Sequence, residues 1–557
     1  MQKEWFKNAV VYQIYPRSFQ DSNADGIGDL RGIQQRLDYL VQLGVDVIWL
    51  NPIYQSPDVD NGYDISDYRK IQPIYGTMQD FDNLLAAVHQ HHLKLMMDLV
   101  VNHTSDQHRW FLESKQSRTN PYADFYIWRD PVDGHAPNNW GSAFSGSAWT
   151  YVPERQQYYL HLFAREQPDL NWENKKVRQH VYEEMRFWLD KGIDGFRMDV
   201  INLISKPFGL PDAPQSSTAL YGDSFTAVTD GPRLNGFLQE MNREVLAHYD
   251  IMTVGEMPDV TTAAAIDYAN LNGKELDMVF QFQHVDLGGN SDPRLGKWND
   301  EKPDLVDLKK TLSTWQTRLA NKAWNSLYWN NHDQPRAVSR FGDDRPQYRE
   351  LSAKMIALTL HGMQGTPYIY AGEEIGMTNV NFTDISEFED IEAINAFEQL
   401  VNQEKIVDAT TMLRYLNTRS RDHARTPMQW SDQLYSGFST VQPYFALNQN
   451  YPEINVEKAK QDPNSVFYFY QKLIELRHQL PLLTYGTYQL LDPDDPQIFA
   501  YQRQYQNQTL FVISNFSEQT VRHAYSQEQG ELLIHNYAED LGQTLRPYES
   551  KMYYYQS

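Results

Sequence analysis

Charged side chains occur inside otherwise apolar stretches of this sequence. In GFRMDV, residues 195–200, Arg197 and Asp199 are two positions apart and would share one face of a strand. Burying that pair costs free energy unless the charges complement each other or a reaction needs them. Polar residues also follow other apolar runs, namely Asp98, Asn102, His103, Glu256, His332 and Asp333. The sequence thus offers three carboxylates that could meet in one site, with no serine–histidine pair and no phosphate loop.

The elements that would position these residues alternate along the chain. Short β-branched runs begin near residues 10, 46, 94, 195, 252, 278, 326 and 367. Between them lie amphipathic helical patterns, with one apolar face in residues 30–40 and another in residues 177–188. Eight alternations of strand and helix predict an α/β fold, the parallel (β/α)8 TIM barrel. In that barrel the carboxyl ends of the strands form the active site, so the polar residues should converge there.

Two connections are too long for a plain barrel. Residues 104–173, after the third strand, are predicted to form an inserted domain, because ordinary crossovers are much shorter. The barrel then comprises residues 1–103 and 174–481, with a second, helical insertion at about 373–464 after strand eight. Both insertions would crowd the mouth. Alternating runs such as QIFAYQRQY and TLFVISNF predict a C-terminal antiparallel β-sandwich domain over residues 482–557.

Composition narrows the class of partner. The 557 residues carry a net charge of −24, so nucleic acid and anionic membranes are poor partners. No run of about 18 apolar residues and no secretory leader is evident, which predicts a cytoplasmic location and no membrane contact. The chain has no cysteine, which fits a reducing compartment. Aromatic residues make up 13%, and flat rings suit stacking against sugars.

Four segments, in this order and spacing, carry a resemblance to a known family: DLVVNH (98–103), GFRMDV (195–200), GEMP (255–258) and NNHDQPR (330–336). They resemble the signature regions of glycoside hydrolase family 13, the α-amylase family. The likeness extends from VYQIYPRSF through ARTPMQW to the C-terminal domain. QPDLNW (167–172) and MDVINLISK (198–206) are similar to the oligo-1,6-glucosidase and dextran glucosidase branch. The resemblance implies a small oligosaccharide substrate and no organic cofactor, and we expect a monomer.

The resemblance also implies a role for each carboxylate. Asp199 would be the nucleophile that forms a covalent glucosyl intermediate, with Arg197 keeping it ionised and oriented. Glu256 would be the general acid and then the base, so it must begin protonated. Asp333 would bind the 2- and 3-hydroxyls of the sugar and favour the distorted transition state. Retention of configuration requires the two reacting carboxyls roughly 5 to 5.5 Å apart.

Further residues are implied to bind substrate. The pocket for the non-reducing glucose would be lined by Asp60, Tyr63, His103, Phe144, Phe163, Arg197, His332 and Arg421. Tyr63 would stack on the ring, and Asp60 would pair with Arg421 to seal the pocket behind the terminal sugar. A sealed pocket implies exo action. Val200, directly after the nucleophile, and the polar pair Lys206 and Glu392 would contact the next sugar.

Several activities remain open within the resemblance. Valine at position 200 goes with α-1,6 cleavage in this branch, which predicts hydrolysis of isomaltose, panose and short dextran fragments. An α-1,4-glucosidase or a sucrose or trehalulose hydrolase stays an alternative. Sucrose isomerases carry an arginine-rich motif where this chain reads HVDLGGNSD, which favours hydrolysis. The same barrel also serves as a non-enzymatic ectodomain in amino-acid transporter heavy chains, but those lack the catalytic carboxylates.

One acidic loop predicts a metal site. In DSNADGIGD (21–29), Asp21, Asn23 and Asp25 repeat the opening of an EF-hand loop, Ile27 offers a carbonyl and Asp29 a further oxygen. Position twelve would be Gly32, so the bidentate glutamate of an EF-hand is missing. Relatives in the resembled branch hold a structural Ca²⁺ in a matching loop. The sequence predicts Ca²⁺ here, with Mg²⁺ or a plain acidic turn as alternatives.

Overall fold

The computed structural model describes residues 4–217, 219–525 and 530–556. An eight-stranded sheet at its centre has the order β11-β10-β9-β5-β2-β1-β13-β12, and its paired strands are parallel. A single parallel bridge between Val279 and Asn325 brings the two edges together. The predicted barrel is confirmed. Its strands are β1 (Val11–Ile14), β2 (Val47–Leu50), β5 (Lys94–Val100), β9 (Gly195–Asp199), β10 (Met252–Glu256), β11 (Met278–Phe280), β12 (Ser326–Leu327) and β13 (Thr366–Tyr370).

Large apolar side chains fill the inside of the barrel. Trp49 stacks on Phe280 with ring centroids 5.6 Å apart, and Phe280 meets Tyr368 edge-on at 4.5 Å. All three rings are buried. They form the floor beneath the carboxyl ends of the strands, so the polar residues at those ends lie on a rigid base.

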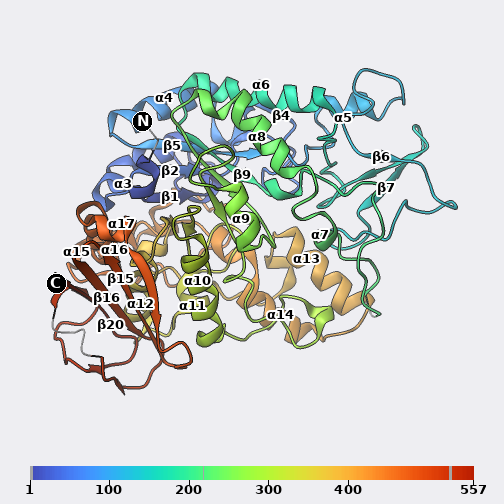
Figure 1. Ribbon diagram of the computed structural model, residues 1–557. Helices are drawn as coiled ribbons and strands as arrows, with labels where there is room; N and C mark the ends of the chain where they lie inside the picture. The colour runs from blue at the N-terminus through green and yellow to red at the C-terminus, as the bar shows by residue number, and fades with distance from the viewer. Residues whose placement is uncertain (1–3, 218, 526–529, 557) are drawn as a thin grey trace.

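Helices surround the barrel (Figure 1). The longest are α4 (Met78–Gln90), α6 (Lys175–Lys191), α8 (Leu234–Glu244), α10 (Leu305–Leu319), α12 (Arg349–His361) and α16 (Val466–Gln479). Helix α4 begins with a capping box, in which Thr77 and Asp80 satisfy each other's backbone N–H groups. The apolar pattern over residues 30–40 forms two helices rather than one, α2 (Leu30–Gln35) and α3 (Leu37–Leu43). Shorter helices are α1 (Trp5–Asn8), α7 (Ser224–Val228), α9 (Thr262–Tyr268), α11 (Ala337–Phe341) and α15 (Val456–Gln461).

The segment between β5 and β9 folds as a small inserted domain. Its antiparallel sheet has the order β6-β8-β7, from β6 (Trp128–Arg129), β7 (Trp149–Val152) and β8 (Gln157–Leu160), preceded by α5 (Arg109–Ser114). The hairpin of β3 (Tyr54–Gln55) and β4 (Asp67–Ile71) precedes it in the chain. The helical segment after β13 contains α13 (Ile391–Phe397), a π-helical turn (Glu398–Gln403) and α14 (Ala409–Arg419). Asn395 of α13 donates to the Phe144 carbonyl at 2.9 Å, so the two insertions meet each other.

The C-terminal part is an antiparallel sheet of order β14-β15-β16-β20-β18 with a separate β17-β19 pair. Its strands are β14 (Thr487–Leu491), β15 (Ile498–Tyr505), β16 (Gln508–Asn515), β17 (Val521–Arg522), β18 (Glu531–His535), β19 (Thr544–Leu545) and β20 (Ser550–Gln556). Residues 481–485 form helix α17 (Pro481–Tyr485), so the strands begin at Thr487 rather than at 482. Lys309 on α10 donates to the carbonyls of Asp492 and Ile498 at 2.8 and 3.0 Å, which holds this domain on the barrel, opposite the inserted domain in Figure 1.

Among the described residues, none of the helices combines the length and the apolar character that a membrane span requires.

Candidate active site

A buried arginine gathers the first carboxylates. Arg197 on β9 has no exposed side-chain surface, and its Nη1 lies 2.5 Å from Asp98 Oδ1 and 2.8 Å from Asp199 Oδ1. Its Nη2 forms a further ion pair with Glu256 at the end of β10. Three carboxylates from three neighbouring strands therefore offset the cost of burying one guanidinium. This network explains why an apolar strand carries Arg197 and Asp199 on one face.

Asp199 and Glu256 lie next to each other at the strand ends. Burial raises the pKa of Asp199 well above its usual range; Arg197 lowers it, and the neighbouring Glu256 raises it. Arg197 therefore favours the ionised form of Asp199, while burial and Glu256 oppose it. Ionising Asp199 beside Glu256 would place like charges together, which is the physical cause of the upward contribution from Glu256.

The turn after β9 has an unusual backbone. Val200 has φ 36° and ψ 41°, in the left-handed region that β-branched residues rarely adopt. This conformation aims the Val200 N–H at Glu256 Oε2, 3.0 Å away. Strain of this kind costs about 1–3 kcal/mol and persists only where the surroundings enforce it. The turn after the predicted nucleophile thus orients the predicted acid.

Asp333, which follows β12, is held as an anion. Burial opposes its ionisation, but His332, Arg421 and Arg425 together hold its pKa well below the usual range. Arg421 Nη1 and Arg425 Nη2 donate to its Oδ1 at 3.1 and 2.8 Å. His332 Nε2 lies 3.0 Å from its other oxygen. This carboxylate is therefore a fixed hydrogen-bond acceptor on the cavity wall.

Two stacked rings connect Asp333 to the barrel floor. Tyr63 and His332 stack with centroids 5.2 Å apart and planes 7° from parallel, and the Tyr63 hydroxyl lies 2.6 Å from His332 Nε2. The amide of Gln13 on β1 contacts His332 Nδ1 at 2.9 Å, and that of Asn51 donates to the Tyr63 hydroxyl at 2.7 Å. These contacts fix both rings, as a stacking platform for a sugar requires.

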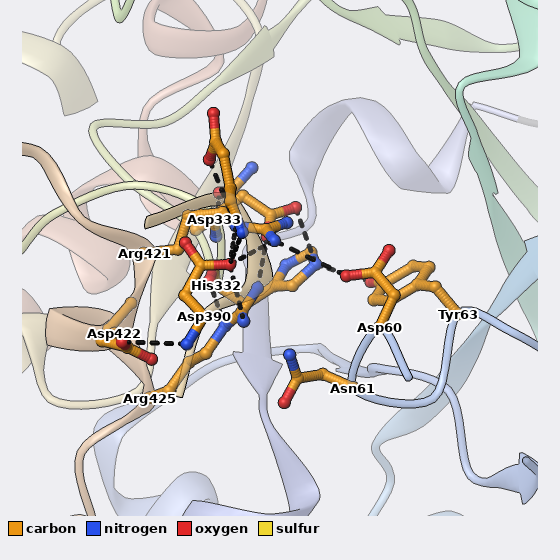
Figure 2. A network of polar contacts seen from close by, with 12 residues as sticks. Asp60, Asn61, Tyr63, His332, Asp333, Asp390, Arg421, Asp422 and Arg425 are labelled. Atoms are coloured by element: carbon orange, nitrogen blue, oxygen red, sulfur yellow. Dashed lines mark hydrogen bonds and ion pairs between the residues drawn. The ribbon is translucent and has the colours of Figure 1, made fainter. Parts of the chain in front are cut away.

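An ion pair closes one end of the site. Arg421 Nη2 lies 3.5 Å from Asp60 Oδ1 and 2.5 Å from Asp390 Oδ1. Figure 2 shows Asp60 and Tyr63 on one side of this network and Arg421, Arg425 and Asp390 on the other. The pairing of Asp60 with Arg421 predicted from the sequence is thus present. Gln167 of the inserted domain donates to the other Asp60 oxygen at 3.1 Å, which keeps the carboxylate in place.

These side chains enclose a cavity of about 280 Å³. The predicted residues on its wall are Asp60, Tyr63, His103, Phe144, Phe163, Asp199, Val200, Glu256, Asp333, Glu392 and Arg421. Arg197 and His332 are fully buried behind that wall and act on it through their neighbours. Burial lowers the pKa of His103 to about 4, so this ring is neutral and can both donate and accept hydrogen bonds. The cavity combines aromatic walls with convergent polar groups, as sugar sites require.

Lys206, predicted to contact the next sugar, is not among the residues that line this cavity. Its Nζ lies 2.7 Å from Asp169 Oδ2 and donates to Asn102 and to the Leu203 carbonyl, away from the cavity wall. It fixes the inserted domain to the end of β5. The lysine beside Glu392 is Lys297, whose Nζ lies 2.6 Å from the Glu392 carboxylate on the cavity wall.

The sequence analysis also missed Asp286 and Arg419, which line the cavity as well. Lys297 and Asp286 lie in an irregular stretch after β11, and Arg419 ends α14. Neither periodicity nor a strand-end position marked them, although Asp286 lies in HVDLGGNSD, the segment already compared with the arginine-rich motif of sucrose isomerases.

The acidic loop at residues 21–29 is wound around Asp21. Its Oδ1 accepts from the N–H groups of Asn23 and Ala24, and its Oδ2 accepts from the Gly26 N–H and the Ser439 hydroxyl. Gly26 has φ 86°, and a Cβ there would lie 2.4 Å from the Gln442 carbonyl oxygen, so only glycine fits.

The oxygens of this loop differ in how fully they are used. The Asp29 carboxylate accepts hydrogen bonds from Ser22 and from the Gly32 N–H, which caps α2. The carboxylates at both ends of the loop, Asp21 and Asp29, are therefore engaged in hydrogen bonds. Asn23 and Asp25 bond only within the loop and keep oxygen lone pairs free. No three His, Cys, Asp or Glu side chains in the described part of the chain gather into a metal-binding group. A cation would therefore displace some of the Asp21 and Asp29 hydrogen bonds.

Comparisons with known proteins agree with this geometry. Residues 13–486 match the model of the alpha amylase catalytic domain, and residues 488–550 match the maltogenic amylase C-terminal domain. Relatives named oligo-1,6-glucosidase are 55% identical in Bacillus cereus, over 99% of this chain and 100% of the relative, and 56% identical in Parageobacillus thermoglucosidasius, over 99% of each. A solved trehalose-6-phosphate hydrolase of Bacillus licheniformis, 48% identical, has a TM-score of 0.93 over 99% of each chain. The chain belongs to the α-amylase family of glycoside hydrolases.

Proposed function

We propose that this chain is a retaining, exo-acting α-glucosidase that hydrolyses α-1,6-glucosidic bonds at the non-reducing ends of isomalto-oligosaccharides and releases glucose. The observation that carries the proposal is the cavity that the Asp60–Arg421 ion pair closes at one end, with Asp199, Glu256 and Asp333 on its wall. A closed end accommodates a terminal sugar and excludes the middle of a chain. Isomaltose, panose and short dextran fragments are the expected substrates.

The geometry supports a double displacement. Asp199 attacks the anomeric carbon while Glu256 donates a proton to the leaving oxygen. Glu256 then takes a proton from water, which attacks the glucosyl intermediate and restores the starting configuration. Asp333, held ionised by Arg421 and Arg425, binds the ring hydroxyls and stabilises the positive charge that develops on the sugar.

The α-1,6 linkage is supported by Val200 and by the relatives named oligo-1,6-glucosidase. Val200 lies on the cavity wall directly after the nucleophile, where the leaving sugar rests. Its strained backbone fixes the position of both methyl groups and narrows that side of the cavity. An α-1,6 linkage has an extra rotatable bond, which lets the leaving sugar bend away from this wall.

The test is steady-state kinetics on isomaltose, isomaltotriose, panose, maltose, sucrose and trehalulose. We expect kcat/KM for isomaltose to exceed that for maltose, and NMR to show α-glucose as the first product. Faster hydrolysis of maltose would overturn the linkage, and faster turnover of sucrose or trehalulose would favour the related activities. Initial release of β-glucose would overturn the mechanism.

We also propose that the loop at 21–29 binds a structural Ca²⁺ through Asp21, Asn23, Asp25, the Ile27 carbonyl and Asp29. Supporting this are its hard oxygen donors and a loop already wound into a tight turn. We further infer that the chain acts as a monomer in the cytoplasm. The cavity wall is complete within one chain, and the lack of cysteine fits a reducing compartment.

A further inference from the structure

One cation on the cavity wall has no partner. Arg419, the last residue of α14, is 5% exposed and lines the same cavity as Asp199 and Glu256. Its side chain makes no hydrogen bond or ion pair with any described residue, and its Nη1 is buried and unpartnered. A buried guanidinium without partners is costly, so a residue of this kind is retained where a ligand completes its hydrogen bonds.

An unpaired anion shares this part of the wall. Asp286, which follows β11, lines the cavity, and its carboxylate has no hydrogen-bond or ion-pair partner among the described residues. Burial lowers the pKa of Arg419 to about 10 and Asp286 raises it, yet the two groups do not form an ion pair. A donor and an acceptor therefore lie near each other, both unused. A bound molecule could engage both at once.

The other charges of the cavity are already neutralised. Lys297 pairs with Glu392 at 2.6 Å, and the closed end is occupied by the network of Asp60, Asp333 and Arg421. Neither Arg419 nor Asp286 bonds to that network. Asp286 and Arg419 share the cavity wall with Lys297 and Glu392, and neither belongs to the network at the closed end.

We propose that Arg419 and Asp286 bind hydroxyls of the leaving sugar and select a neutral one. The proposal rests on the proposed glucosidase function, because it assigns the sugar on the outer side of the scissile bond. Vicinal hydroxyls both donate and accept, so they match a guanidinium and a carboxylate together. A phosphorylated sugar would instead bring a dianion next to the Asp286 carboxylate, and the Lys297 charge is already paired with Glu392. Selection against phosphate follows from Asp286, which repels the phosphate and competes with it for Arg419.

The test compares two substrates that share the same glucosyl half. Isomaltose has a leaving group rich in hydroxyls, whereas p-nitrophenyl α-glucoside has none on its leaving ring. Arg419→Gln and Asp286→Asn should each lower kcat/KM for isomaltose by about 10- to 100-fold, the effect of losing charged hydrogen bonds. The decrease in kcat/KM for p-nitrophenyl α-glucoside should be at least several-fold smaller than the decrease for isomaltose. Arg419→Lys should restore part of the isomaltose activity.

The matched control is Arg414→Gln on the same helix. Arg414 is 58% exposed and pairs with Asp300, so its loss should leave both substrates unaffected. Equal losses on both substrates in the Arg419 and Asp286 variants, with a lower Tm, would assign these residues to structure and overturn the proposal. If the wild type prefers maltose, the linkage proposal fails, but the role of Arg419 and Asp286 can still be tested. The comparison is then between kcat/KM for maltose and kcat/KM for p-nitrophenyl α-glucoside in the same variants.

Trehalose 6-phosphate tests the selection of a neutral leaving sugar. We expect the wild type to hydrolyse it at least about 10-fold less efficiently than isomaltose, as unfavourable charge contacts predict. Efficient hydrolysis that Arg419→Gln abolishes would show that the guanidinium binds phosphate, and would overturn the selection.

Discussion

At the scale of single residues, Arg197 determines the chemistry of the site. One guanidinium holds Asp98, Asp199 and Glu256, so the loss of one partner leaves two others in place. The arginine therefore stays compensated when a single carboxylate is removed. This redundancy allows the catalytic groups to be tested without unfolding the barrel.

We expect Asp199→Ala and Glu256→Gln each to lower kcat by at least about a thousandfold, because each removes a group that both steps of the reaction need. Thermal unfolding should change little. Kinetics on p-nitrophenyl α-glucoside and a Tm measurement check this. Azide should restore activity to Asp199→Ala by replacing the nucleophile and give a β-glucosyl azide. Near wild-type activity in either variant would reject the assignment.

The sequence predicted the site residues that end barrel strands, since strand ends converge in this fold. It did not predict that Lys206 pairs with Asp169, because that contact depends on how the inserted domain folds back onto the barrel. The sequence also did not assign Lys297, Asp286 and Arg419 to the cavity. They reach the cavity through irregular segments whose course depends on long-range packing.

At the scale of elements, the turn after β9 places Val200, in a strained backbone conformation, where it can influence the preference for α-1,6 over α-1,4 linkages. Val200→Thr keeps the β-branched shape and the left-handed backbone but replaces a methyl group with a hydroxyl. We expect it to raise kcat/KM for maltose relative to isomaltose by roughly tenfold, about 1.4 kcal/mol of differential transition-state binding. Val41→Thr, at an exposed position on α3, is the control. An unchanged ratio would assign the linkage preference to other parts of the wall.

Most elements followed from apolar periodicity. All eight strands and the helix α6 lie where the pattern placed them, because buried strands and amphipathic helices leave regular signals. The break between α2 and α3 carried no such signal, because the apolar residues before and after Arg36 keep the same helical spacing. Helix α17 also escaped notice, because a helix of five residues is shorter than the pattern needs.

At the scale of the whole molecule, the loop at 21–29 ties distant segments together. Asp21 accepts from Ser439 and its N–H donates to the Phe438 carbonyl, while the Tyr444 N–H donates to the Gly26 carbonyl. The first strand-to-helix loop is thus fastened to the segment that precedes α15. A cation bound in this loop would stabilise both.

We therefore expect Ca²⁺ to raise the Tm of the EDTA-treated protein. When the free Ca²⁺ concentration is a hundred times Kd, the free energy of unfolding should increase by about 2.7 kcal/mol. Scanning calorimetry with and without Ca²⁺ measures this, and Mg²⁺ tests the choice of ion. Asp25→Asn, at an exposed loop position, should weaken the response without unfolding the apoprotein. A Tm that does not respond to either ion would mean that the loop is held by its hydrogen bonds alone.

The closed end of the cavity also determines how a chain is degraded. In the proposed reaction, the glucosyl group bound to Asp199 lies behind the departing oligosaccharide, against Asp60 and Arg421. Glucose is freed only after that oligosaccharide has left, because water must enter through the same opening to attack the glucosyl group bound to Asp199. The shortened chain therefore cannot slide forward for a second cut while bound. Degradation is distributive rather than processive, and products of every intermediate length accumulate in solution before glucose becomes the main product.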